Sequence, residues 1–88
     1  MGCIYFLKSL RSGLVKIGYT ESFDRRLSQL RNANADQLDV LGVLSGSLEQ
    51  EHDLHADAEP YRDHAEWYSD CEEIRDLIER TLKETNSI

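Results

Sequence analysis

The sequence predicts a small α/β domain of the α+β type, in which a three-stranded antiparallel sheet is flanked by about three helices in the order β-β-α-β-α-α. Short apolar runs bounded by turn residues indicate the strands, and apolar residues at helical spacing behind capping residues indicate the helices. With 88 residues, 40% of them hydrophobic, the chain has the size of one domain spanning residues 1–88. We expect a core at about residues 3–83 and a fraying tail at 84–88.

Two apolar runs at the start of the chain are predicted to pair as a β-hairpin. The runs and the spacer between them are residues 4–9, 14–18 and 10–13. The spacer is rich in turn residues and has the length of a hairpin loop. If residues 10–11 form the tip of the turn, Tyr5 lies opposite Lys16 and both side chains share one face of the sheet.

The first helix is predicted at residues 22–33, because Thr20 or Ser22 can cap its start. Its apolar stripe consists of Phe23, Leu27 and Leu30. We expect it to end within residues 32–36, since Asn and Asp tolerate left-handed and turn conformations.

The third strand is predicted at residues 38–44, and because it is apolar on both faces we expect it to be well covered. Ser47 and Gln50 then fit a capping box that opens a second helix at residues 48–59. Pro60 ends that helix, because proline cannot continue it.

Residues 61–68 are predicted to form a loop that ends in Trp67 and Tyr68, two aromatic residues that we expect to pack on the core. Ser69 and Glu72 fit a second capping box, which opens the third helix. The apolar stripe of this helix consists of Ile74, Leu77, Ile78 and Leu82.

Composition excludes several classes of protein. No apolar run approaches the roughly 20 residues that a membrane-spanning helix needs. The first residues lack the pattern of a secretory signal, so we expect a cytoplasmic protein with no membrane contact. Cys3 and Cys71 are too few and too far apart for a cysteine metal site.

The charge is unevenly distributed along the chain. The net charge of −7 disfavours a nucleic-acid enzyme, because phosphate affinity normally comes from Lys and Arg. However, residues 1–46 carry a net charge of +2 and residues 47–88 carry −9. If the protein binds DNA, we expect the first half to make the contact.

The junction between the second strand and the first helix is predicted to bind phosphate. Gly18 permits tight turning of the backbone or close approach of another group. The first turn of the helix presents free N–H groups beside Arg25 and Arg26, and such a helix start attracts anions. We therefore expect Gly18, Thr20 and Arg25 to contact a substrate phosphate.

Four short segments occur in a characteristic order. Residues 3–5 read Cys-Ile-Tyr and residues 16–18 read Lys-Ile-Gly, with Arg26 eight positions after the glycine. Residues 51–55 read Glu-His-Asp-Leu-His and residues 65–68 read Ala-Glu-Trp-Tyr. Together they resemble the GIY-YIG nuclease superfamily, in its compact phage and bacterial branch of the meiotically up-regulated gene type, whose later segments carry Glu-x-x-x-His and Gly-Glu-Trp-Phe.

The resemblance implies a metal-dependent endonuclease that hydrolyses DNA phosphodiester bonds. Tyr5 would contact the attacking water, and Lys16, which replaces the second tyrosine of the motif, would share the role of base. Arg26 would hold a phosphate oxygen as negative charge develops. Glu51 would bind the divalent metal, and a single carboxylate with waters suits Mg²⁺ or Mn²⁺ better than zinc.

Two further residues are candidates for supporting this site. His55 follows Glu51 by four positions on the same side of the predicted helix, and is either a partner of the metal ligand or a histidine at the edge of the core. Glu66 is the second candidate carboxylate. Leu30 stands where many members of the superfamily have a histidine, so one water-positioning group is missing.

Each catalytic candidate also has a structural interpretation. Tyr5 fits a packed strand aromatic, and Lys16 fits a solvent-facing lysine. Arg26 fits an arginine whose stem covers the edge of the core, and Glu51 fits a solvated helix face. The alternative function is therefore a catalytically inactive GIY-YIG-like module that binds nucleic acid or a partner protein. In either case no small-molecule cofactor is expected, and a partner protein would supply specificity.

Overall fold

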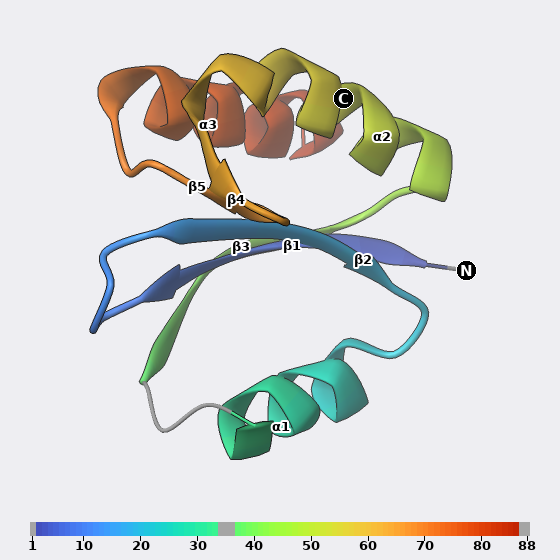
Figure 1. The fold of residues 1–88 in the computed structure, drawn as a ribbon. Helices are drawn as coiled ribbons and strands as arrows, with labels where there is room; N and C mark the ends of the chain where they lie inside the picture. Colours follow the sequence, from blue (N-terminus) through green and yellow to red (C-terminus); the bar gives the residue numbers. More distant parts are fainter. Residues whose placement is uncertain (1, 34–36, 87–88) are drawn as a thin grey trace.

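The computed structural model describes residues 2–33 and 37–86, which fold around an antiparallel sheet of five strands (Figure 1). The strands are β1 (Cys3–Ser9), β2 (Val15–Thr20), β3 (Leu38–Ser45), β4 (Arg62–His64) and β5 (Trp67–Tyr68). Their order across the sheet is β3-β1-β2-β5-β4. The three predicted strands are all present, but they form the larger part of a wider sheet.

Three α-helices enclose this sheet, as predicted. They are α1 (Phe23–Ala33), α2 (Leu48–Ala58) and α3 (Glu72–Asn86), with a short 3-10 helix, η1 (Glu59–Tyr61), after α2. Helix α1 lies on one face of the sheet, and α2 and α3 lie on the other (Figure 1). The small α+β architecture is therefore confirmed.

The prediction of only three strands was wrong, because the expected loop at residues 61–68 contains β4 and β5. Strand β5 pairs with β2, with Val15 opposite Tyr68 and Lys16 opposite Trp67. These strands have three residues and two residues, which is too short for the alternation of apolar side chains that identifies a strand. They are defined by backbone pairing, which leaves no pattern in the sequence.

The register of the β1–β2 hairpin also differs from the prediction. Tyr5 pairs with Gly18, and Lys16 pairs with Leu7. The turn is centred one residue further along the chain, which moves each pairing partner by two residues, because Gly13, at φ 75°, donates its N–H to the Ser9 carbonyl at 2.8 Å and closes a longer loop. The shift is even, so Tyr5 and Lys16 still share a face and are diagonal neighbours.

Alternation along the central strands gives the sheet a core on each face. Ile4, Phe6 and Ile17 are fully buried on the side of α2 and α3, where they join Ile74. Tyr5, Leu7 and Leu38 are buried on the other side. Phe23, Leu27 and Leu30 of α1 pack against this second cluster, as their helical spacing predicts.

Strand β3 is less covered than predicted. Val40, Leu41 and Val43 are 42%, 40% and 39% exposed. Strand β3 lies at the edge of the sheet, and its register with β1 shifts at a bulge, so the side chains of α1 do not cover it evenly. A run of apolar residues therefore does not by itself identify a central strand.

The two predicted capping boxes have different outcomes. The Ser47 hydroxyl accepts from the Gln50 N–H, and the Gln50 side chain accepts from the Ser47 N–H, as predicted. The second box is wrong, because α3 begins only at Glu72 and the Arg75 N–H donates to the Cys71 carbonyl. The start of α3 is held instead by Asp70.

Asp70 joins the start of α3 to β1 through two cations. Its carboxylate accepts from Lys8 Nζ and from Arg75 Nε, each at 2.8 Å. The hydrogen bonds from Arg75 and Lys8 lower the pKa of Asp70 to about 2. The carboxylate therefore stays charged at all physiological pH values.

Some predictions concern residues outside the described part of the chain. The end of the first helix falls at Ala33, as predicted, whereas residues 34–36 lie outside the described residues. Helix α3 continues to Asn86, and residues 87–88 of the expected tail also lie outside. Within residues 2–33 and 37–86, no helix combines the length and apolar character needed to cross a membrane.

We expect Ala65→Gly to stabilise the protein. Ala65 is the residue other than glycine with a positive φ, 49°, among the described residues, and such a conformation costs about 1–2 kcal/mol for an L residue. Glycine relieves this strain, but it also increases the conformational entropy of the unfolded chain, which lowers the stability of the folded state by about 0.4–1 kcal/mol. The free energy of unfolding should therefore rise by up to about 1 kcal/mol. Urea denaturation measures the change.

The control is Ala56→Gly, at an exposed position of α2. Glycine inside a helix should lower the free energy of unfolding by about 1 kcal/mol. Equal destabilisation by both substitutions would show that position 65 is not strained.

Candidate functional site

The candidate site lies where β5 ends and leaves β2 with an open edge. Strand β5 begins at Trp67, opposite Lys16, so no strand formed by the described residues pairs with the remainder of β2 on that side. The Ile17 N–H donates instead to the carbonyl of Glu66 at 3.1 Å. Glu66 therefore stands at the edge of the sheet, where its side chain can reach groups from both faces.

On the α1 face, Tyr5 and Arg26 contact each other. Tyr5 is only 1% exposed, and Arg26 Nε lies 3.5 Å from its hydroxyl oxygen. The hydrogen bond to Tyr5 raises the pKa of Arg26 above its usual value, against a smaller opposing effect of burial, and the carboxylate of Glu66 adds to the rise. The guanidinium is thus a fixed cation beside a phenol.

Gly18 makes room for that phenol. A Cβ at this position would lie 2.3 Å from Cζ and 2.4 Å from Oη of Tyr5, distances that real Cβ atoms do not show. The glycine at the end of the second motif segment therefore allows close approach of a side chain from the neighbouring strand. This agrees with one of the two roles predicted for it.

Lys16 carries a second cation into the site. It is 7% exposed, its Nζ lies 2.9 Å from Oε1 of Glu66, and the same atom is 5.4 Å from the centroid of the Trp67 ring. A carboxylate and an aromatic face both stabilise an ammonium group. The interpretation as a solvent-facing lysine is therefore wrong.

On the other side of the open edge, three possible metal ligands converge. His55 Nε2 lies 3.5 Å from Oε2 of Glu51 and 4.0 Å from Oε2 of Glu66. One ligand atom from each residue lies within 4.8 Å of the other two. Because carboxylate oxygen and imidazole nitrogen both bind divalent metals, this group could hold a metal ion.

The burial of Glu51 is consistent with a bound cation. Glu51 is 5% exposed, whereas Glu49 and Asp53 on the same helix are exposed, so Glu51 is not part of a solvated face. Among the described residues, the ion-pair partners of its carboxylate are two ring nitrogens, at 3.5 Å from His55 and 3.9 Å from His52. A buried carboxylate without close partners is costly, and a bound cation would remove that cost.

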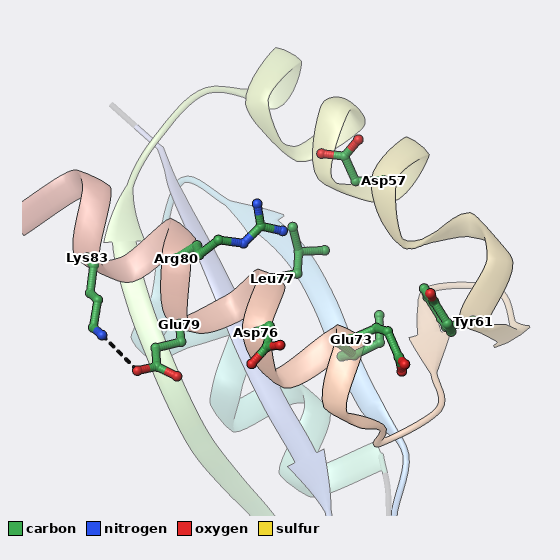
Figure 2. A pocket seen from close by; sticks show the side chains of 9 residues that line it. Asp57, Tyr61, Glu73, Asp76, Leu77, Glu79, Arg80 and Lys83 are labelled. Atoms are coloured by element: carbon green, nitrogen blue, oxygen red, sulfur yellow. Dashed lines mark ion pairs between the residues drawn. The ribbon is translucent and has the colours of Figure 1, made fainter.

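The three ligands open onto a shallow pocket. Its lining residues are Glu51, His52, His55, Arg62, Ala65 and Glu66. A larger pocket lies elsewhere, between α3 and the α2–η1 segment, and none of the candidate residues lines it (Figure 2). Pocket size therefore does not indicate the site here, whereas the convergence of ionisable groups does.

The structure does not bring two of the predicted residues into the cluster. The Thr20 hydroxyl accepts from the Ser22 N–H at 3.1 Å and lies 3.2 Å from the Ser22 carbonyl, so it shapes the turn before α1. Arg25 is exposed on α1, and no ion pair joins it to any residue in the described ranges. Both remain predictions as phosphate contacts.

Tyr68 makes a polar contact in addition to packing in the core. Tyr68 is fully buried in the core, as predicted, but its hydroxyl also forms a hydrogen bond with Nδ1 of His55. Burial raises the pKa of Tyr68 above its usual value. The sequence contained one indication of this contact. Tyr68 stands where the Gly-Glu-Trp-Phe signature of the superfamily has phenylalanine, so this chain has a hydroxyl there to bond His55.

Comparison with known proteins gives one family. A model of the T5orf172 domain matches residues 2–84 of the chain. This family is linked to nucleases of the GIY-YIG and HNH-like types. Searches of curated proteins and of solved structures found no significant match.

We expect Gly18→Ala to destabilise the protein by about 1–3 kcal/mol, because the new methyl group overlaps the Tyr5 ring and overpacks a buried site. In a Tyr5→Leu background the same change should cost much less, since the ring is gone. Urea denaturation of the four proteins in this cycle gives the coupling energy. Equal costs in both backgrounds would mean that Gly18 does not accommodate Tyr5.

Proposed function

Because the chain belongs to the T5orf172 domain family, we propose that it is a GIY-YIG-type endonuclease that hydrolyses DNA phosphodiester bonds with a divalent metal. One observation carries the proposal. The Tyr5–Arg26 pair and the Glu51–His55–Glu66 group meet at the open edge of β2, where Lys16 and Glu66 join them at 2.9 Å. Cations for a phosphate and ligands for a metal thus occur side by side.

Arg26 binds the scissile phosphate in this proposal. Its planar guanidinium can donate two parallel hydrogen bonds to non-bridging oxygens and stabilise the charge that grows on them. The contact with Tyr5 orients the group before substrate arrives. Gly18, Thr20 and Arg25 contact the neighbouring phosphate at the start of α1.

Tyr5 orients the attacking water. Its hydroxyl oxygen can accept a hydrogen bond from the water while Arg26 holds the phosphate at the correct distance for in-line attack. Burial of the ring at 1% exposure fixes this direction. Such preorganisation is what a phosphoryl-transfer site chiefly needs from its protein.

Lys16 contributes charge in the resting state. The ion pair with Glu66 fixes its Nζ at the open edge of β2, where the ammonium group can stabilise the phosphate electrostatically. To share the role of base it would have to give up a proton, and Glu66 lies beside it to accept one. The two roles differ in their dependence on pH.

Glu51 holds the metal in this proposal, with His55 and Glu66 close by. Mg²⁺ or Mn²⁺ bound there would supply positive charge to stabilise the leaving oxygen. The acidic second half of the chain raises the affinity for cations, and the net positive first half faces the DNA. The inactive binding module remains the alternative and is decided by the experiments below.

We expect Lys16→Met to separate the two roles of the lysine. If Lys16 acts as a base, the cleavage rate should fall far more at neutral pH than at high pH, where hydroxide can substitute. If it acts as a fixed charge, the fall should be similar across the whole pH range tested. Rates of supercoiled-plasmid nicking between pH 6 and pH 10 provide the measurement.

We expect Glu51→Ala to abolish metal-dependent cleavage without destabilising the metal-free protein. The carboxylate is buried close to Glu66, and no Lys or Arg pairs with it within residues 2–33 and 37–86, so its removal should leave the melting temperature unchanged or raised. Wild type should gain stability with added Mg²⁺ through mass action, and the variant should not. Thermal melting and plasmid nicking are measured on the same samples.

The matched control is Glu49→Ala, one exposed carboxylate of the same helix. It should keep both cleavage and the response to Mg²⁺. If Glu51→Ala and wild type respond alike to Mg²⁺ and nick DNA alike, Glu51 is not the metal ligand. No nicking by wild type under any metal would favour the inactive module.

A further inference from the structure

His55 is held in one orientation by a buried residue that the proposed mechanism does not use. Nδ1 of its ring forms a hydrogen bond with the hydroxyl of Tyr68, and the two ring centroids lie 5.6 Å apart. Tyr68 itself is 0% exposed and is fixed in the core beside Val15 by the β2–β5 pairing. The direction of the imidazole is therefore set by the core.

The other ring nitrogen points into the metal group with no partner of its own. Nε2 of His55 is buried and forms no hydrogen bond within the described part of the chain. The carboxylate oxygens of Glu51 and Glu66 lie 3.5 Å and 4.0 Å away, and neither makes a hydrogen bond with Nε2. Three electron-rich groups thus surround a point where no hydrogen bond connects them.

We propose that His55 binds the metal directly through Nε2, and that Tyr68 is the positioning residue that presents this nitrogen. The inference rests on the proposed metal at Glu51 and changes its expected identity. A centre with one imidazole and two carboxylates prefers ions that bind nitrogen well, such as Co²⁺ or Zn²⁺, over Mg²⁺, which prefers oxygen.

The hydroxyl of Tyr68 is what makes this arrangement work. When Nε2 gives its lone pair to a metal, Nδ1 must carry the ring proton and needs an acceptor. The Tyr68 oxygen is that acceptor, in the place where metal-binding histidines usually have a carboxylate, carbonyl or water. A phenylalanine at position 68 would fill the same space and leave the Nδ1–H unpaired.

Titration calorimetry with Co²⁺ and Mg²⁺ tests the inference on the whole chain. Wild type should bind Co²⁺ more tightly than Mg²⁺. Tyr68→Phe should weaken Co²⁺ binding about 10- to 100-fold, the usual effect of losing such a partner, and change Mg²⁺ binding much less. The visible absorption spectrum of bound Co²⁺ should also differ between wild type and any variant in which His55 no longer binds the metal.

The matched control is Tyr61→Phe, because Tyr61 is partly buried and lines the larger pocket, away from the metal group (Figure 2). It should bind both ions as wild type does. His55→Gln provides a second variant at a residue whose side chain is 15% exposed, and it should remove the preference for Co²⁺ with Tyr68 in place. Thermal melting without metal checks that each variant is folded.

The outcomes separate this inference from the proposed function. If Tyr68→Phe and His55→Gln bind Co²⁺ like wild type while Glu51→Ala does not, His55 is not a ligand and the metal on Glu51 stands. If wild type binds neither ion, both the inference and the metal-dependent enzyme are wrong. Loss of Co²⁺ preference in both variants, with Tyr61→Phe unchanged, supports the inference.

Discussion

The ion pair between Lys16 and Glu66 is the contact on which the candidate site depends. It joins a strand lysine that is 7% exposed to a turn carboxylate at the open edge of β2. If β5 continued alongside the rest of β2, its backbone would fill this edge and separate the side chains on one face of the sheet from those on the other. Because β5 is so short, one carboxylate can face Lys16 with one oxygen and His55 with the other.

This arrangement requires an 88-residue domain to bury several charges. Burying a charge costs free energy unless it is paired, and a small core provides little free energy to offset that cost. Lys16 has a partner in Glu66, whereas the Glu51 carboxylate pairs with histidine rings and with no Lys or Arg in the described part of the chain. The unbalanced carboxylate is the part of the structure that is best explained by binding a cation.

Local patterns in the sequence predicted the helices and the main strands correctly. The helical spacing of Phe23, Leu27 and Leu30 and the Ser47–Gln50 box depend on neighbours along the chain, so they can be read without the fold. The two short strands and the hairpin register depend on contacts between distant segments or on one glycine conformation. Neither leaves a periodic pattern, and both were predicted incorrectly.

The candidate residues show the same division. The four-residue spacing placed Glu51 and His55 on one side of a helix, and the structure confirms this. The burial of Lys16 and the hydrogen bond between Tyr68 and His55 could not be predicted, because both require β5 to lie beside β2. Pairing of this kind is a property of the folded chain, not of any segment.

The proposed function requires a metal to bind at the open edge of β2, next to the arginine that holds the phosphate. An anomalous difference map from crystals soaked in Mn²⁺ would show whether it does. We expect a peak bonded to the Glu51 carboxylate, within reach of His55 and Glu66 and on the side that faces Arg26. A map with no peak at Glu51, or with peaks only among the exposed acidic residues of α3, would rule this metal site out.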